Sequence, residues 1–151
     1  MAYFTFNQPE TLEVKVALSA TSTEGALRNL RTETDDLNFE QLLAETQTKW
    51  NKELTVLQVD GTEDQKAMLY TSLYHTMINP SIYMDVDGQY RGIDHNIHQA
   101  EGFTNYTVFS LWDTYRALHP LFNVLQPKRN ADMVASMLKH SEQSVHGLLP
   151  V

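Results

Sequence analysis

Hydrophobic positions recur at helical spacing over much of the chain. The spacing predicts a helix over residues 22–33, with Ser22 or Thr23 as its cap and apolar residues along one side. A longer helix should follow Asn38 and continue to about residue 57, where Asp60 and Gly61 stop it. Residues 62–65 read as a capping box for a third helix, which must end before Pro80.

Two other segments have a different period. Residues 12–18 alternate apolar and polar side chains, which predicts a half-buried strand. Asp87 and Gly88 are typical of a type I′ turn, so residues 82–84 and 89–91 should form a hairpin around them. Residues 85–88 also resemble a fragment of a calcium loop, but the third acidic ligand and the distal Glu that an EF-hand requires are missing. We therefore favour the hairpin.

The C-terminal third returns to helical spacing. Residues 111–125 should be helical with a kink or break at Pro120, whose ring cannot continue the helix undisturbed. Pro127 suits the first turn of a last helix that Gly147 ends. The residues expected to face inward on this helix are apolar: Met133, Val134, Met137, Leu138 and Val145.

Composition limits the class of protein and its partners. The chain has 151 residues, 42% of them hydrophobic and 20% charged, which is typical of a globular domain. Its net charge of −8 argues against nucleic acid and anionic membranes as partners, and no apolar run is long enough to span a bilayer. Cysteine is absent, which excludes disulfides and thiolate chemistry. The first residues do not resemble a signal peptide.

The segment over residues 92–107 is predicted to be a long polar loop. His95 and His98 are three residues apart and could share a zinc ion, but no third ligand is evident, so ordinary loop histidines are the better interpretation. Long loops are often functional, and this one also contains Asn105 and Tyr106. Its polar and aromatic side chains would suit the rim of a sugar pocket.

Residues 105–122, NYTVFSLWDTYRALHPLF, carry the strongest chemical signal. Trp112 lies beside Asp113, and an indole next to a carboxylate can stack on a pyranose while accepting hydrogen bonds from its hydroxyls. A buried core helix explains the same pattern if Asp113 caps a helix end or pairs with Arg116. From the residues alone, both interpretations remain open, and aromatic stripes more often belong to a core.

The same stretch, together with residues 68–94 (MLYTSLYHTMINPSIYMDVDGQYRGID), resembles the calcium-dependent α-mannosidases of glycoside hydrolase family 92, found in Bacteroidetes. The likeness runs from about residue 12 to the end of the chain. It implies a mainly α fold: an internal piece of a larger enzyme with the opening helices of an (α/α)6 barrel, an N-terminal strand and a small hairpin. Residues 1–20 would be the last strand of a β-sandwich, residues 21–80 linker helices, and residues 81–151 the hairpin, loop and first barrel helices.

The resemblance also implies a function, the trimming of mannose-containing glycans by an inverting exo-α-mannosidase. The general acid, the base and the calcium ligands would lie beyond Val151, so this chain should provide no catalytic residue and no metal ligand. It would provide a substrate-binding wall made by Asp113 and Trp112. Arg116 would orient Asp113, and Asn105 and Tyr106 would support the site. The family suggests a periplasmic, cell-surface or secreted enzyme.

Two alternatives accompany this hypothesis. A stand-alone helical binding module without chemistry would fit the acidic charge and the lack of an evident nucleophile and base. An α-barrel phosphorylase or another glycosidase would keep the fold and change the reaction. As a piece of a barrel, the chain should expose apolar helix faces and self-associate.

Overall fold

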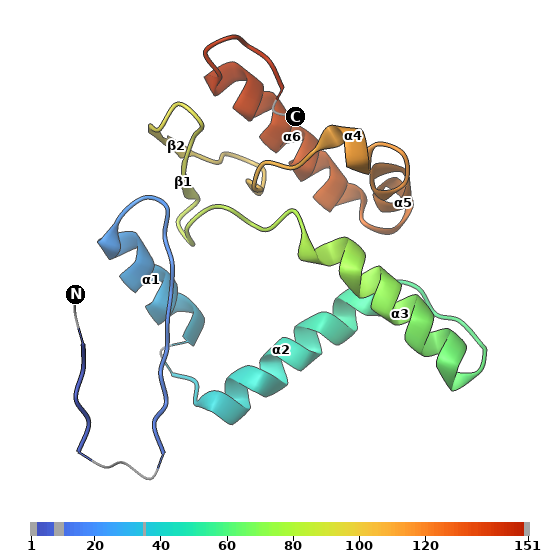
Figure 1. Cartoon of the computed structure of the whole chain (residues 1–151), viewed down its shortest axis with the longest axis horizontal. Helices are drawn as coiled ribbons and strands as arrows, with labels where there is room; N and C mark the ends of the chain where they lie inside the picture. The colour runs from blue at the N-terminus through green and yellow to red at the C-terminus, as the bar shows by residue number, and fades with distance from the viewer. Residues whose placement is uncertain (1–2, 8–10, 35, 150–151) are drawn as a thin grey trace.

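The computed structural model describes residues 3–7, 11–34 and 36–149. The described residues form six helices and one two-stranded sheet, which confirms the mainly α fold (Figure 1). In chain order, the elements are α1 (Thr23–Thr34), α2 (Phe39–Leu54), α3 (Glu63–Ile78), β1 (Gln89–Arg91), β2 (Ile97–Gln99), α4 (Leu111–Thr114), α5 (Leu118–Leu125) and α6 (Pro127–Gln143). None of the described helices is long and apolar enough to cross a membrane.

Local signals place the starts of α2 and α3 correctly. Asn38 and Thr62 each accept a hydrogen bond from the backbone N–H three residues on, and the Gln at that position bonds back to the cap residue. These are the reciprocal bonds of a capping box, the second of which the sequence predicts. The two helices meet through Trp50 and Tyr74, whose ring centroids lie 4.5 Å apart in an edge-to-face arrangement.

The predicted strand over residues 12–18 is not formed. In the described part of the chain, residues 11–19 are extended without a sheet partner, and Val14, Val16 and Leu18 are exposed. A strand needs a neighbour for its backbone hydrogen bonds, and no described segment pairs with this one. The segment instead lies beside α1, where the Asn29 amide donates to the backbone carbonyl of Leu18 at 2.9 Å.

The predicted hairpin has a different register. β1 pairs with β2 in antiparallel fashion, with Tyr90 opposite His98, so the hairpin turns at residues 92–96 and not at Asp87. The turn over residues 85–88 exists, but only Gly88 there has a positive φ, 82°, so it is not type I′. Residues 82 and 83 pair across to residues 105 and 106 instead. Backbone partners distant in sequence thus decide the register.

A buried carboxylate ties α1 to the turn that precedes β1. Asp85 is 3% exposed and accepts hydrogen bonds from Ser19 Oγ at 2.7 Å, from Thr21 Oγ1, and from Asn29 Nδ2 at 2.9 Å. Burial alone would raise the pKa of this carboxyl, but the three hydrogen bonds and the nearby Arg28 outweigh burial, so the pKa is lowered. Asp85 therefore stays ionised and holds the segment before α1, α1 itself and the turn together.

The break predicted near Pro120 occurs three residues earlier. α4 ends at Thr114, and α5 begins at Leu118, which places Pro120 in the first turn of α5, where its missing N–H is tolerated. α6 begins at Pro127 as predicted but ends at Gln143. Its inward face is only partly the predicted one, because Val134, Leu138 and Val145 are exposed. The buried residues of α6 are Asn130, Asp132, Met133, Ser136, Met137 and His140.

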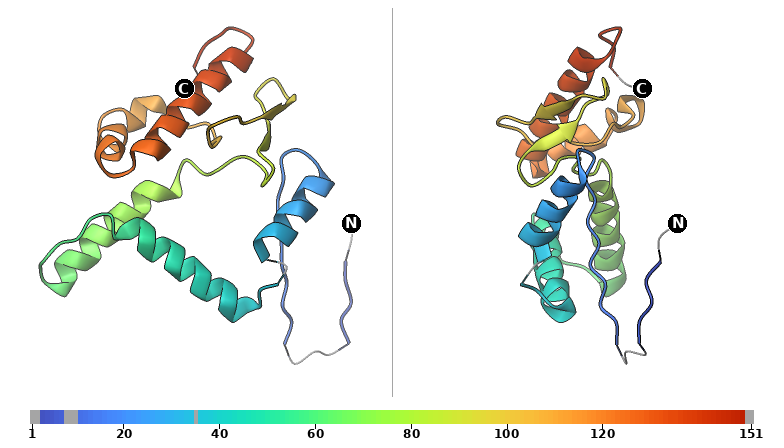
Figure 2. Two further views of the ribbon diagram at one scale, coloured as in Figure 1. Left: turned by 180° about the vertical axis from the view of Figure 1, so that it is seen from behind. Right: turned by 90° about the vertical axis from the view of Figure 1, so that its left-hand side faces the viewer.

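The hydrophobic core lies between α6 and the segment that leads into α5. Tyr106, Phe109, Phe122, Met133 and Met137 form it, with Met77, Leu111 and Leu118 packed against it. Away from this core, the elements spread apart. α1, the α2–α3 pair and the α4–α6 group form separate arms (Figure 2). α2 has no buried residue, and many large apolar side chains are exposed.

Candidate functional site

The short helix α4 presents Trp112 and Asp113 to solvent. Leu111 packs against the core, and Thr114, three residues on, is half-buried on the same side of the turn. The two residues between them must then point away from the core, and Trp112 is 65% exposed. We call this exposed pair, Trp112 and Asp113, the α4 edge.

The Asp113 carboxylate has no hydrogen-bond or ion-pair partner among the described residues. Its backbone N–H donates to the Ser110 carbonyl at 3.2 Å, and its side chain caps no helix end. An unpaired carboxylate keeps its acceptor capacity for a ligand, and a sugar hydroxyl is a suitable donor. Asp113 is therefore not a helix cap, and its carboxylate is open to solvent.

Arg116 contacts aromatic rings and not the carboxylate. Its guanidinium carbon lies 4.9 Å from the Trp112 ring centroid and 5.3 Å from that of Tyr115, and its Nε donates to the Tyr115 hydroxyl at 3.0 Å. The expected pairing of Arg116 with Asp113 is not formed, because the helix is interrupted after Thr114 and no longer sets residues three apart on one face. Arg116 instead holds the Trp112 indole through a cation–π contact.

Asn105 and Tyr106 belong to the core and not to a loop rim. Asn105 is fully buried and donates from Nδ2 to the Tyr83 carbonyl at 2.9 Å. Tyr106 is 7% exposed, and its backbone N–H donates to Ser136 Oγ at 3.0 Å. Neither side chain hydrogen-bonds to Trp112, Asp113 or Arg116 in the part of the chain that the structure describes. Their support of the α4 edge is therefore indirect at most.

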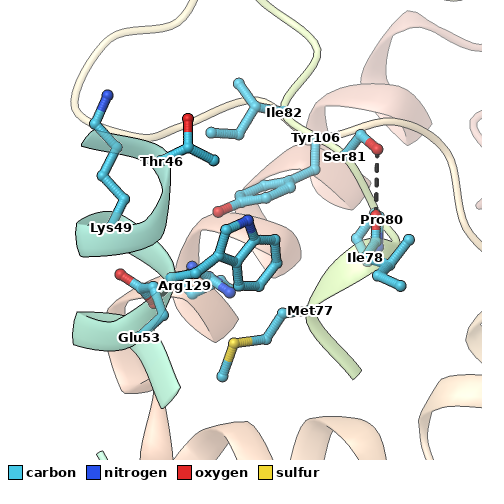
Figure 3. A pocket seen from close by; sticks show the side chains of 11 residues that line it. Thr46, Lys49, Glu53, Met77, Ile78, Pro80, Ser81, Ile82, Tyr106 and Arg129 are labelled. Carbon is cyan, nitrogen blue, oxygen red and sulfur yellow. Dashed lines mark hydrogen bonds and ion pairs between the residues drawn. The ribbon is translucent and has the colours of Figure 1, made fainter. Parts of the chain in front are cut away.

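A hollow of about 530 Å³ lies between α2, α3, α6 and the segment after α3 (Figure 3). Its lining is mostly apolar and includes Met77, Ile82 and the Tyr106 ring. The charges at its wall are paired, because Glu53 accepts from Arg129 at 2.9 Å and from Gln126 at 2.8 Å. Neither residue of the α4 edge lines this hollow, so it is separate from the sugar chemistry suggested above.

The loop histidines do not form a metal site. His98 Nε2 lies 3.0 Å from both carboxylate oxygens of Asp94, and the hydrogen bonds from Asn96 and then His98 lower the pKa of Asp94 to about 2. His95 has a positive φ of 65° within the hairpin turn. Among the described residues, no group of three or more His, Asp or Glu side chains could hold a metal ion. We derive no step through calcium.

Sequence reasoning did not identify the polar contacts beneath α4. Thr114 Oγ1 lies 2.9 Å from His119 Nε2, and His119 Nδ1 lies 2.7 Å from Asn130 Oδ1. The residues belong to α4, α5 and α6 respectively. The sequence signal was single polar residues within the predicted helices, which the assignment of inward faces by hydrophobicity alone overlooked.

Comparisons with known proteins identify the family of this chain. The family profile of the glycosyl hydrolase family 92 catalytic domain matches residues 25–151. The family GH92 α-mannosidase BT3965 from Bacteroides thetaiotaomicron has 52% sequence identity with this chain, and its structure matches with a TM-score of 0.84. The match covers 88% of this chain and 18% of that one. A second structure of that enzyme, in complex with mannoimidazole, gives the same identity and TM-score, and its match covers 88% of this chain and 17% of that chain.

The family GH92 inverting mannosidase BT2199 from Bacteroides thetaiotaomicron VPI-5482 is 30% identical, with a TM-score of 0.78, and the match covers 87% of this chain and 18% of that one. The chain therefore spans less than a fifth of the length of these relatives. No curated protein matches it. Since the family profile covers most of the chain, this chain belongs to glycosyl hydrolase family 92.

Proposed function

We propose that this chain forms part of the substrate-binding wall of an inverting exo-α-mannosidase that removes terminal mannose from glycans. Asp113 accepts hydrogen bonds from hydroxyls of the terminal mannose, and Trp112 packs against the apolar face of that sugar. The observation that carries the proposal is the α4 edge, where an exposed carboxylate with no partner among the described residues adjoins an indole that Arg116 contacts. A relative with 52% identity is an α-mannosidase whose structure contains mannoimidazole, which supports mannose as the sugar.

The chemistry of inversion indicates which groups this chain need not provide. Inversion requires a general acid and a base carboxylate on opposite faces of the sugar, far enough apart to admit a water molecule. We assign neither role to this chain, and we expect both groups, with the calcium ligands, in the sequence that the longer relatives have in addition. Asp113 then acts by binding, and its hydrogen bonds matter most if they strengthen as the sugar ring flattens.

The experiment replaces Asp113 in the full-length enzyme, meaning the family-length protein that contains this sequence. Two charge-assisted hydrogen bonds of about 1.5 kcal/mol each amount to about 3 kcal/mol, so Asp113→Ala should lower kcat/KM by roughly a hundredfold. Asp113→Asn keeps the shape and a weaker acceptor, and it should lie between wild type and Ala. Both variants should melt within a few degrees of wild type, because the carboxylate has no partner among the described residues to lose.

A matched control is Asp60→Ala, which removes another exposed carboxylate from the connection between α2 and α3. It should leave kcat/KM unchanged. Full activity of Asp113→Ala together with a lower melting temperature would refute the sugar contact and establish a structural role.

A further inference from the structure

The α4 edge sits on an element that cannot hold its own shape. α4 has four residues, and its cap residue Ser110 makes no side-chain capping bond. A single helical turn is unstable in isolation, because nucleation fixes several residues for one hydrogen bond. The chain also leaves the helix directly after Thr114. The orientation of Trp112 and Asp113 must therefore be fixed by contacts beneath the turn.

Those contacts form a continuous chain of side-chain hydrogen bonds. Thr114 Oγ1 lies 2.9 Å from His119 Nε2, His119 Nδ1 lies 2.7 Å from Asn130 Oδ1, and Asn130 Nδ2 donates to Asn123 Oδ1 at 2.7 Å. We call these four side chains, Thr114, His119, Asn130 and Asn123, the polar chain. It joins the last residue of α4 to α5 and to the first turns of α6.

The direction of the hydrogen bonds can be read along the polar chain. Asn130 donates through Nδ2 to Asn123, so its Oδ1 accepts, and His119 Nδ1 must carry the hydrogen. In the neutral ring, Nε2 then accepts from the Thr114 hydroxyl, whose single hydrogen has the Ser110 carbonyl, 3.1 Å away, as its alternative acceptor. The His119 ring also packs on Phe109, with centroids 5.5 Å apart, and Asn130 is 7% exposed. Thr114 and His119 are half-buried and Asn123 is exposed, so the bond between His119 and the buried Asn130 is the one best protected from water and the most costly to break.

We propose that the polar chain positions the α4 edge for sugar binding, with Thr114 and His119 as positioning residues that do not touch the substrate. This inference rests on the proposed function for its catalytic consequence. The structural claim that the polar chain fixes α4 against α6 depends only on the hydrogen bonds and not on the proposed function. Without the Thr114 hydroxyl, the turn loses its link to His119, and Trp112 and Asp113 lose their fixed orientation.

The test uses the full-length enzyme and three substitutions. Thr114→Val removes the hydroxyl and keeps the shape, whereas Thr114→Ser restores it. Thr76→Val, the matched control, removes a threonine hydroxyl that bonds only to the Leu73 carbonyl of its own helix α3. We expect Thr114→Val to speed amide hydrogen exchange at residues 114 and 115 at least tenfold. It should also lower kcat/KM at least tenfold, because misplacement of about 1 Å can cost about a hundredfold in rate.

Thr114→Ser and Thr76→Val should stay within about twofold of wild type in exchange at these residues, and Thr76→Val also in kcat/KM. If Thr114→Val does not fold, His119→Phe replaces it, since it keeps a ring against Phe109 and removes both nitrogens. Unchanged amide exchange in the variant that folds would overturn the proposal. Faster exchange with unchanged kcat/KM would confirm the positioning of α4 and refute the proposed function of its edge, so the two failures are distinguishable.

Discussion

Replacement of Asp85 by Asn should strongly destabilise the chain, because this carboxylate is a buried acceptor for three donors. Ser19, Thr21 and Asn29 all donate to it, and no water-exposed surface remains to compensate. An asparagine at this position is neutral, and its Nδ2 would face one of the existing donors. The substitution therefore weakens the bonds that persist and creates one conflict between donors.

The magnitude follows from the bonds. A hydrogen bond to a charged group contributes about 1.5–3 kcal/mol, and a buried donor left without an acceptor costs about 1–3 kcal/mol. Since Asn retains one acceptor oxygen, we expect the free energy of unfolding to fall by about 3 kcal/mol. Urea unfolding of the 151-residue chain at pH 7 measures it directly. The control is Asp87→Asn, which weakens the exposed ion pair with Arg28, keeps an oxygen for the hydrogen bond from the Gln89 backbone N–H, and should cost less than about 1 kcal/mol.

The pH dependence of this loss in the free energy of unfolding provides a second test of the role of Asp85. The pKa of Asp85 is lower in the folded state than in the unfolded state, so the carboxylate stabilises the fold above its unfolded pKa of about 3.9 and ceases to do so as the pH falls through the folded pKa. The difference in the free energy of unfolding between wild type and Asp85→Asn should thus be constant from about pH 5 to 7 and become smaller below about pH 4. A gap under about 1 kcal/mol at pH 7 would refute the reasoning.

Two further predictions concern the activity of the isolated chain and the ion pair between α2 and α6. The purified 151-residue chain should release no mannose from α-mannosides, because we expect the acid and the base in other parts of the enzyme; calcium-dependent release by this chain would contradict that expectation. Glu53→Gln should lower the free energy of unfolding by about 1 kcal/mol, because the Glu53–Arg129 pair between α2 and α6 is partly exposed and screened. In a double-mutant cycle, Arg129→Gln should lower the free energy of unfolding little further once Glu53→Gln is present. Fully additive losses of that free energy would show that the pair is not coupled.

Local features of the fold could be predicted from the sequence. The cap at Asn38, the capping box at Thr62 and the proline at the start of α6 act within one turn, so residue type is enough to identify them. The hairpin register and the strand over residues 12–18 depend on partners far away in the sequence. For this reason, the turn chemistry of Asp87 and Gly88 misled the hairpin prediction, and the alternating segment remained extended without pairing.

In the candidate site too, residue type predicted some features, whereas others depend on partners distant in the sequence. Trp112 and Asp113 were predicted to contact sugar from their residue types together with the family resemblance; the structure leaves both exposed, and the sugar contact stays a prediction. Arg116 was assigned to the wrong neighbour because the prediction assumed an unbroken helix past Thr114. The polar chain was missed because Asn130 and His119 lie on helix faces that were judged by hydrophobicity, whereas buried polar residues are recognised only through their partners.

A crystal structure of the full-length enzyme with mannoimidazole bound would test the central claim most directly. The account predicts that the Asp113 carboxylate lies within hydrogen-bond distance, about 2.5–3.0 Å, of at least one hydroxyl of the mannose ring. The Trp112 indole should lie against the same ring. An inhibitor bound elsewhere, with no sugar atom in contact with Asp113 or Trp112, would contradict the account.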